Sequence, residues 1–376
     1  MELSLPSVFS SSLAISLLLL LLHMITHFKN ILFKYGIIPC YILSILILLR
    51  GFFPFDFYAI HLTKSIYSYK IIPSFLDFLS RKTFRYFSLK DCFIFIWGLG
   101  FLFSFLKKTI IFLHFYRQIR REQIYTDFYT NQTCNFIYNN LFFKKRNVYI
   151  YISSMVDTPL TIGIFSPIIV LPKISYKNIE LAYIFLHELL HFKHKDFLFN
   201  ILAELLSSIH WWNPVISLNL VPSINHVQEL YVDYSIKKLS LKEGNIQYLE
   251  TLLKTLKHSN TPKGIVGGIP FFSGNNRFKV KQRILCLTND SIYQNHLKGA
   301  FICFLFFLLS FTFVFEASFP SNIDEETGEH VYSISPGNSY IIKKEKEYII
   351  YLGGDYFDTT NELIDDFKSL PIIYNQ

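Results

Sequence analysis

The sequence has few cysteines and few charged residues for its length. Five cysteines are scattered over 376 residues and lie mostly within apolar runs, which excludes a disulfide framework or a set of zinc-binding thiolates. Charged residues make up 17% of the chain, below the roughly 25% of an average soluble domain. Because apolar residues make up 51%, a disordered or highly charged protein is excluded, and a membrane protein is indicated.

Four apolar stretches are predicted to cross a bilayer, whose core needs about 20 helical residues. They are residues 8–27, 35–53, 92–106 and 299–315. The first stretch has no basic residue at its start and no small-residue cleavage site after it, so we expect it to be retained. The third is short and bounded by lysines, so we expect its helix to extend past Lys107 and Lys108 while their side chains reach the interface.

The net charge of +8 is unevenly distributed. Residues 1–315 carry 32 basic and 16 acidic side chains, whereas residues 316–376 carry 4 and 12. Basic residues gather on the cytoplasmic side of membrane proteins, so residues 107–298 are predicted to lie in the cytoplasm and the acidic tail outside. Residues 54–91 disagree with this orientation, because they carry six basic and three acidic residues and four spans would place them outside. The positive net charge is thus explained by the basic residues on the cytoplasmic side of a membrane protein, and no direct nucleic-acid partner is expected.

These observations predict four parts. Residues 1–106 form a membrane region with three spans, 107–298 a cytosol-facing domain, 299–315 the fourth span, and 316–376 a short extracytoplasmic tail. Within the tail, 340–351 are predicted to form a hairpin and 359–370 a short helix.

The cytosol-facing domain changes its periodicity along the chain. Residues 147–153 alternate apolar and polar, and 158–172 are rich in β-branched residues with Pro and Gly between them, which predicts short strands joined by a turn. Residues 178–193 have helical spacing, with Asn178 as a candidate N-cap. Helices are also predicted over 197–209 and 225–238.

The helix at 178–193 contains the motif His187-Glu-Leu-Leu-His191. Positions i and i+4 share a helix face, so both imidazoles can bind one Zn²⁺. Glu188 is then placed to act as the general base on the attacking water. A catalytic zinc site takes a third protein ligand, which Glu229 on a later helix can supply. Asp233, one turn further on the same face, is predicted to accept a hydrogen bond from a ligand histidine and so fix its tautomer.

Other residues remain open as alternatives. Glu204 and His226 are alternative third ligands, although Glu204 lies in an apolar helix and is also compatible with a buried partner. His210, beside two tryptophans, is interpreted as a structural histidine at the membrane interface, with assistance to the transition state as the alternative. His194 and Asp196 are interpreted as the polar end of the zinc helix.

Several segments occur together in a recognisable order. They are 159–172, the motif at 187–191 with Lys195-Asp196 beyond it, His210-Trp-Trp-Asn-Pro214, Glu229 with Asp233, and Arg283-Ile284. Over about residues 1–316 the chain resembles the BlaR/MecR-type membrane zinc metallopeptidases. The resemblance implies an α-helical membrane protein with four transmembrane helices and an α+β zinc metallopeptidase domain of the gluzincin type. It also implies His187, His191 and Glu229 as ligands, with Glu188 as the general base.

The resemblance further implies a signalling role in the bacterial inner membrane. In the best-known members an outer sensor binds β-lactam, and a winged-helix repressor of the BlaI/MecI type is inactivated. The 61 residues from Glu316 to the end of the chain contain no Ser-x-x-Lys, so we do not expect that sensor here. The predicted function is cleavage of a cytoplasmic protein, with the lipid bilayer and a protein or peptide substrate as partners. The alternatives are a catalytically silent receptor and a general quality-control protease.

Overall fold

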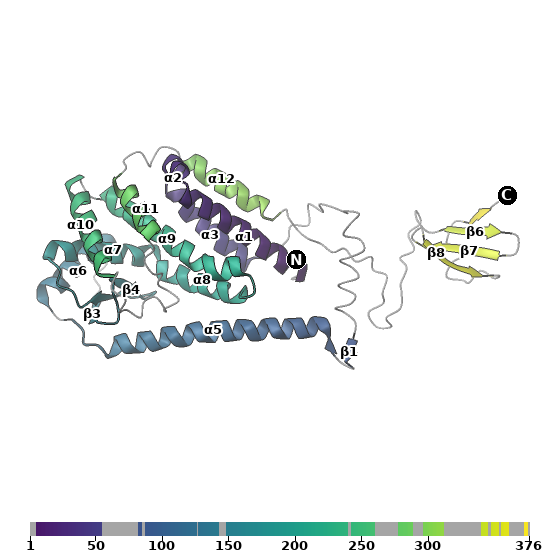
Figure 1. Ribbon diagram of the computed structural model, residues 1–376, viewed down its shortest axis with the longest axis horizontal. Coiled ribbons are helices and arrows are strands. Elements are labelled where there is room, and N and C mark those ends of the chain that lie inside the picture. The colour runs from purple at the N-terminus through teal and green to yellow at the C-terminus, as the bar shows by residue number, and fades with distance from the viewer. Residues whose placement is uncertain are drawn as a thin grey trace. The chain divides into compact units, whose positions relative to one another are not determined.

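The computed structural model describes most of the chain in two separate units. The described residues are 5–54, 82–84, 87–125, 127–142, 148–239, 242–259, 277–288, 296–311, 340–344, 347–352, 355–360 and 372–374. The first unit comprises residues 1–64 and 77–316 and contains the described helices, and the second comprises 65–76 and 317–376 (Figure 1).

Apolar helices occupy most of the predicted spans, and residues 312–315 of the fourth span lie outside the described residues. α1 (Leu5–His27) and α5 (Leu89–Arg121) are each long and apolar enough to cross a membrane. α2 (Lys29–Tyr35) and α3 (Ile38–Phe52) meet that criterion only as a pair, bent by 97°, while α12 (His296–Leu309) is a shorter apolar helix. The described chain therefore has two to three such helices, and four crossings stay a prediction.

The helices α1, α3, α9 (Pro214–Leu239) and α12 share one apolar core. Ile15 and Leu22 of α1 pack with Leu43 of α3 and Leu220 of α9, and all four side chains are fully buried. α12 approaches α3 closely at Gly299, where a Cβ atom would lie 2.7 Å from the ring of Pro39. The close approach explains a glycine inside an otherwise bulky apolar helix.

α5 continues well beyond the apolar stretch from which it was predicted. Its 33 residues include Lys107 and Lys108, so the expected extension past the lysines is confirmed. One side of α5 lies along α8 (Asp196–Ile209), where the indole of Trp97 donates to the carbonyl of Ile209 at 3.0 Å. The indole of Trp211 in turn donates to the carbonyl of Trp97 at 3.1 Å.

A small sheet lies beside these helices. β3 (Tyr149–Ser153) pairs in parallel with β5 (Ile168–Pro172), and β4 (Leu160–Ile162) pairs antiparallel with β5. The order β3-β5-β4 makes β4 an edge strand. Gly163 follows it with φ +121°, a conformation that favours glycine, and its missing Cβ leaves room for the carbonyl of Ser166. The predicted strands and turn are confirmed.

Six helices complete the first unit. They are α6 (Phe128–Phe142), α7 (Asn178–His194), α8, α9 (Pro214–Leu239), α10 (Lys242–Ser259) and α11 (Arg277–Thr288). The predicted N-cap of α7 is displaced by one residue, because Lys177 takes the capping position and its backbone N–H donates to Glu180 at 2.7 Å. The short strands β1 (Lys82–Phe84) and β2 (Phe87–Ser88) precede α5.

The second unit contains a four-stranded sheet. Its strands are β6 (Tyr340–Lys344), β7 (Glu347–Leu352), β8 (Asp355–Thr360) and β9 (Ile372–Tyr374), in the order β8-β7-β6-β9. β6 and β7 are antiparallel, so the predicted hairpin is confirmed. The predicted helix at 359–370 begins inside β8, and its remaining residues lie outside the described residues.

Candidate metal centre

α7 places two imidazoles side by side. His187 and His191 are one turn apart, their ring centroids are 4.7 Å apart, and their Nε2 atoms are 3.1 Å apart. Glu188 lies between them in sequence and is 5% exposed. The helical spacing alone therefore brings two nitrogen donors to one point.

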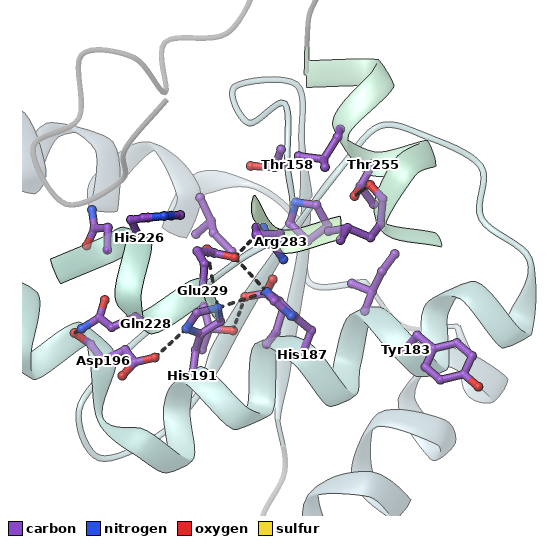
Figure 2. A pocket seen from close by; sticks show the side chains of 18 of the residues that line it. Thr158, Tyr183, His187, His191, Asp196, His226, Gln228, Glu229, Thr255 and Arg283 are labelled. Atoms are coloured by element: carbon purple, nitrogen blue, oxygen red, sulfur yellow. Dashed lines mark hydrogen bonds and ion pairs between the residues drawn. The ribbon is translucent and has the colours of Figure 1, made fainter. Parts of the chain in front are cut away.

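A carboxylate from α9 meets these imidazoles. Glu229 Oε2 lies 3.4 Å from His187 Nε2, and Oε1 lies 3.7 Å from His191 Nε2. Figure 2 shows the three side chains converging, and their ligand atoms lie within 4.8 Å of one another. A tetrahedral zinc ion with bonds near 2.0–2.1 Å keeps its ligand atoms about 3.3 Å apart. Two imidazole nitrogens and one carboxylate oxygen at these separations fit such an ion.

His191 is oriented by Asp196. Its Nδ1 lies 2.6 Å from Asp196 Oδ2, and because an ionised carboxylate only accepts, Nδ1 carries the proton and Nε2 is left for a metal. Lys195 makes this contact possible, since its left-handed conformation (φ 60°) joins α7 to α8 and turns Asp196 back towards the helix. The prediction that Asp196 belongs to the polar end of the zinc helix is wrong, because the turn at Lys195 makes Asp196 the first residue of α8.

His187 is oriented by a tyrosine that no motif had indicated. Tyr248 of α10 donates its hydroxyl proton to Asp233 Oδ1 at 2.5 Å and accepts from His187 Nδ1 at 2.9 Å. Burial and the adjacent Asp233 carboxylate raise the pKa of Tyr248 well above its usual range, so the phenol keeps its proton. The predicted direct hydrogen bond from a ligand histidine to Asp233 was wrong: His187 Nδ1 is 3.8 Å from Asp233 Oδ1, and Tyr248 joins the two.

Arg283 of α11 holds both carboxylates of α9. Its guanidinium donates to Asp233 at 2.7 and 2.9 Å and pairs with Glu229 Oε2 at 2.6 Å. Desolvation raises the pKa of Glu229, but Arg283 and the two imidazoles outweigh it and hold that pKa well below its usual range. Glu229 is therefore ionised, which is the state a metal ligand requires.

Glu188 is fixed by the edge strand. The hydroxyl of Thr161 in β4 donates to Glu188 Oε2 at 2.9 Å. Both residues line a cavity of about 180 Å³ whose walls come from β4 and from α7 to α11. The two imidazoles and Glu229 line the same cavity, so a carboxylate base lies beside the cluster of metal-binding groups.

The two alternative ligands, Glu204 and His226, are not part of the cluster of metal-binding groups. Glu204 pairs with Lys108 Nζ at 2.8 Å, so the buried partner considered for it exists. His226 lines the cavity but binds Gln282 Oε1 through Nε2 at 2.6 Å, and burial lowers its pKa to about 4. His210 is buried, and its Nδ1 is 3.1 Å from the carbonyl of Leu206. His194 packs against the ring of Tyr231.

The segment that contains this site is similar to known proteins. Residues 77–287 match the family model described as BlaR1 peptidase M56. The chain is 30% identical to the Methicillin resistance mecR1 protein of Staphylococcus aureus (strain Mu50 / ATCC 700699) over 129 residues, which are 34% of this chain and 22% of that protein. It is also 30% identical to the Regulatory protein BlaR1 of Bacillus licheniformis over 139 residues, which are 36% of this chain and 23% of that protein.

A longer alignment is made with the Regulatory protein BlaR1 of Staphylococcus aureus. There the identity is 24% over 219 residues, 56% of this chain and 34% of that protein. The chain thus matches between 22% and 34% of the length of these three relatives. The resemblance inferred from the motifs is confirmed.

Proposed function

The chain belongs to the BlaR1 peptidase M56 family, and from this premise we propose that it is an integral membrane zinc endopeptidase that relays an envelope signal by cleaving a cytoplasmic protein. One observation carries the proposal: His187, His191 and Glu229 converge on one point beside the buried carboxylate of Glu188. The basic excess of residues 107–298 supports a peptidase domain that faces the cytoplasm.

We assign the metal to the three converging side chains. His187, His191 and Glu229 would hold Zn²⁺, and Asp196, Tyr248, Asp233 and Arg283 would keep them oriented. When bound, the ion supplies Lewis-acid activation of the peptide carbonyl and of water. Two imidazoles with one carboxylate are a donor set typical of catalytic zinc.

Glu188 is the proposed general base. Thr161 occupies its Oε2, so its other oxygen is left to take a proton from the attacking water. The water oxygen bonds to the carbonyl carbon, the C–N bond breaks, and Glu188 passes the proton to the leaving nitrogen. Burial of Glu188 keeps bulk water from competing for this proton.

The edge strand β4 offers a place for an extended substrate. Its inner edge pairs with β5, and Thr161 at its centre contacts Glu188. Backbone pairing to a free strand edge tolerates varied side chains. We expect N-methylation of the substrate backbone to reduce cleavage at alternate residues, since only every second N–H faces the strand, and an even response along the peptide would contradict this placement.

The proposed substrate is a winged-helix repressor of the BlaI/MecI type. Two of the relatives are a methicillin resistance protein and a regulatory protein, which supports a role in regulation. A general quality-control protease is the second candidate, because backbone pairing at β4 does not itself select one sequence.

A comparison of matched variants tests the activity. We expect the detergent-purified chain to contain one zinc per molecule and to cleave a co-expressed winged-helix repressor. Glu188→Gln should retain the zinc and lose cleavage by at least a factor of about 100. Glu180→Gln, on the same helix but away from the cavity, is the control and should retain both. Absence of zinc from the wild-type chain would refute the proposal, and cleavage of unrelated unfolded proteins at equal rates would favour quality control.

A further inference from the structure

Three polar side chains line the cavity without serving the metal cluster. They are Asn200 of α8 and the neighbours Asn225 and His226 of α9. Each is less than 10% exposed. Buried polar groups in proteins are nearly always hydrogen-bonded, so a set of them along one cavity needs an explanation.

The hydrogen-bonding role of each His226 nitrogen can be derived from its neighbours. The side-chain amide of Gln282 donates through Nε2 to the backbone carbonyl of Thr26, which can only accept. Gln282 Oε1 is therefore the atom that faces His226, at 2.6 Å from Nε2. Because a carbonyl oxygen accepts, His226 Nε2 carries the proton and Nδ1 is a bare acceptor. Burial keeps the ring neutral near pH 7, since it lowers the pKa to about 4.

This chain of bonds is anchored in the last turn of α1. Thr26 lies one residue before the end of that helix, where carbonyl groups lack a partner within the helix. Gln282, 2% exposed, satisfies one of them. The orientation of His226 is thus fixed by two buried bonds rather than by solvent.

The two asparagines add unpaired groups to the same wall. Neither the nitrogen nor the oxygen of the Asn225 amide has a partner among the described residues, and Asn200 Oδ1 also has none. Among those residues His226 bonds through Nε2 to Gln282, and no group bonds to its Nδ1. A side-chain amide offers a donor and an acceptor in the geometry of a peptide group, and Nδ1 adds a second acceptor.

We propose that Asn200, Asn225 and His226 form a subsite that binds the main chain of the substrate, with His226 Nδ1 accepting a hydrogen bond from one substrate N–H. The inference rests on the proposed peptidase function, because it assumes that the cavity receives a peptide. It adds substrate-binding residues that lie outside the metal cluster and its supporting network.

Binding to an inactive chain tests the subsite without turnover. The probe is a fluorescein-labelled β-casein peptide, measured by anisotropy with the full-length, zinc-loaded Glu188→Gln chain in detergent. His226→Ala should raise its Kd about fivefold to tenfold, as expected for the loss of one hydrogen bond. His226→Asn should restore the Kd to within about twofold, because its Oδ1 offers an acceptor near the position of Nδ1. His210→Ala, which removes a buried histidine outside the cavity, should leave the Kd unchanged.

Ester analogues identify the partner of His226. Each peptide N–H is replaced in turn by an ester oxygen, which removes one donor. At one position the ester should raise the Kd for the chain that retains His226. The same ester should not raise the Kd further when His226→Ala is also present. Additive losses at every position, or failure of His226→Asn to restore binding, would overturn the proposal. Normal peptide binding combined with no cleavage by the wild-type chain would instead refute the peptidase function.

A measurement of the tautomer does not depend on any substrate. In the chain labelled with ¹⁵N-histidine, the His226 signal, assigned by its loss in His226→Asn, should show a protonated Nε2 and an unprotonated Nδ1. Gln282→Met should produce a mixture of tautomers, because it removes the acceptor of Nε2. A protonated Nδ1 in the wild-type chain would overturn the proposal even if His226→Ala does not fold.

Discussion

At the scale of single residues, the two ligand-type histidines are held by different chemistry. Asp196 gives His191 a direct charged acceptor at 2.6 Å, whereas His187 reaches Asp233 only through the hydroxyl of Tyr248. A charged acceptor makes an imidazole more basic and a stronger ligand than a neutral one does. The two supports should therefore contribute unequally to metal binding.

We expect Asp196→Asn to weaken zinc binding by a factor of about 10 to 100, the range for loss of an outer hydrogen-bond partner of a ligand histidine. Tyr248→Phe should weaken it by a factor of about 10 or less, because only a neutral acceptor is lost. Zinc affinity is measured by competition with a chelator. Asp157→Asn and Tyr149→Phe, both outside the cavity that contains the ligand histidines, are matched controls, and the prediction fails if Tyr248→Phe has the larger effect.

His226 also makes an acid-dependent contribution to stability. Burial lowers its pKa from 6.5 to about 4 in the folded chain. As the pH falls from 6.5 to 4, His226 becomes protonated in the unfolded state but stays neutral in the folded state. The free energy of unfolding therefore decreases. The full shift corresponds to roughly 3 kcal/mol.

We therefore expect the Tm of His226→Asn to decrease less than the Tm of the wild-type chain between pH 6.5 and pH 4.5. Both chains are compared after zinc removal, so that ligand protonation affects them equally. Parallel curves over this range would show that His226 is not the acid-sensitive group.

At the scale of elements, the contact of α5 with α8 contains an ion pair between the half-buried Lys108 and the buried Glu204. Lys108 Nζ lies 2.8 Å from Glu204 and also donates to Ser207 at 3.1 Å, while Ser104 donates to Ser208 at 3.4 Å. Charges are costly to remove from water, so one partner without the other is strongly destabilising. The polar face of α8 thus specifies where the long apolar helix α5 attaches.

Lys108→Met should destabilise the chain by about 3 kcal/mol, because it leaves the buried Glu204 carboxylate unpaired. The double variant Lys108→Met/Glu204→Met should recover most of that loss, since no buried charge remains. Thermal unfolding in detergent measures both. The exposed neighbour Lys107→Met is the control and should have little effect, and equal losses in the single and double variants would contradict an ion pair.

The elements themselves could be predicted because periodicity is local information. Alternation predicted β3, and helical spacing predicted α7 with both imidazoles on one face. The supporting contacts could not be predicted, because they depend on how distant elements pack. No spacing rule links Tyr248 on α10 to His187. The contact of Asp196 depends on the left-handed backbone conformation of Lys195, which is rarely adopted by residues other than glycine. The sequence thus predicted the candidate ligands but missed the network that orients them.

At the scale of the whole chain, charge and apolar content together predict an orientation. With the basic segment 107–298 in the cytoplasm, the start of α5 must lie on the outer side. That start carries Cys92, which is exposed, whereas Cys40, Cys134, Cys286 and Cys303 are buried. The chain therefore has a native thiol that reports the location of one end of α5.

We expect a membrane-impermeant maleimide to label Cys92 in intact spheroplasts, because the thiol is exposed at the predicted outer end of α5. In the variant Cys92→Ser/Lys173→Cys, the new thiol lies on the exposed loop after β5 and should be labelled only after the membrane is permeabilised. Cys92→Ser alone is the control for background labelling of the buried thiols. The reverse pattern would place the peptidase domain outside the cell and, since a cytoplasmic repressor would then be out of reach, would also exclude the proposed substrate.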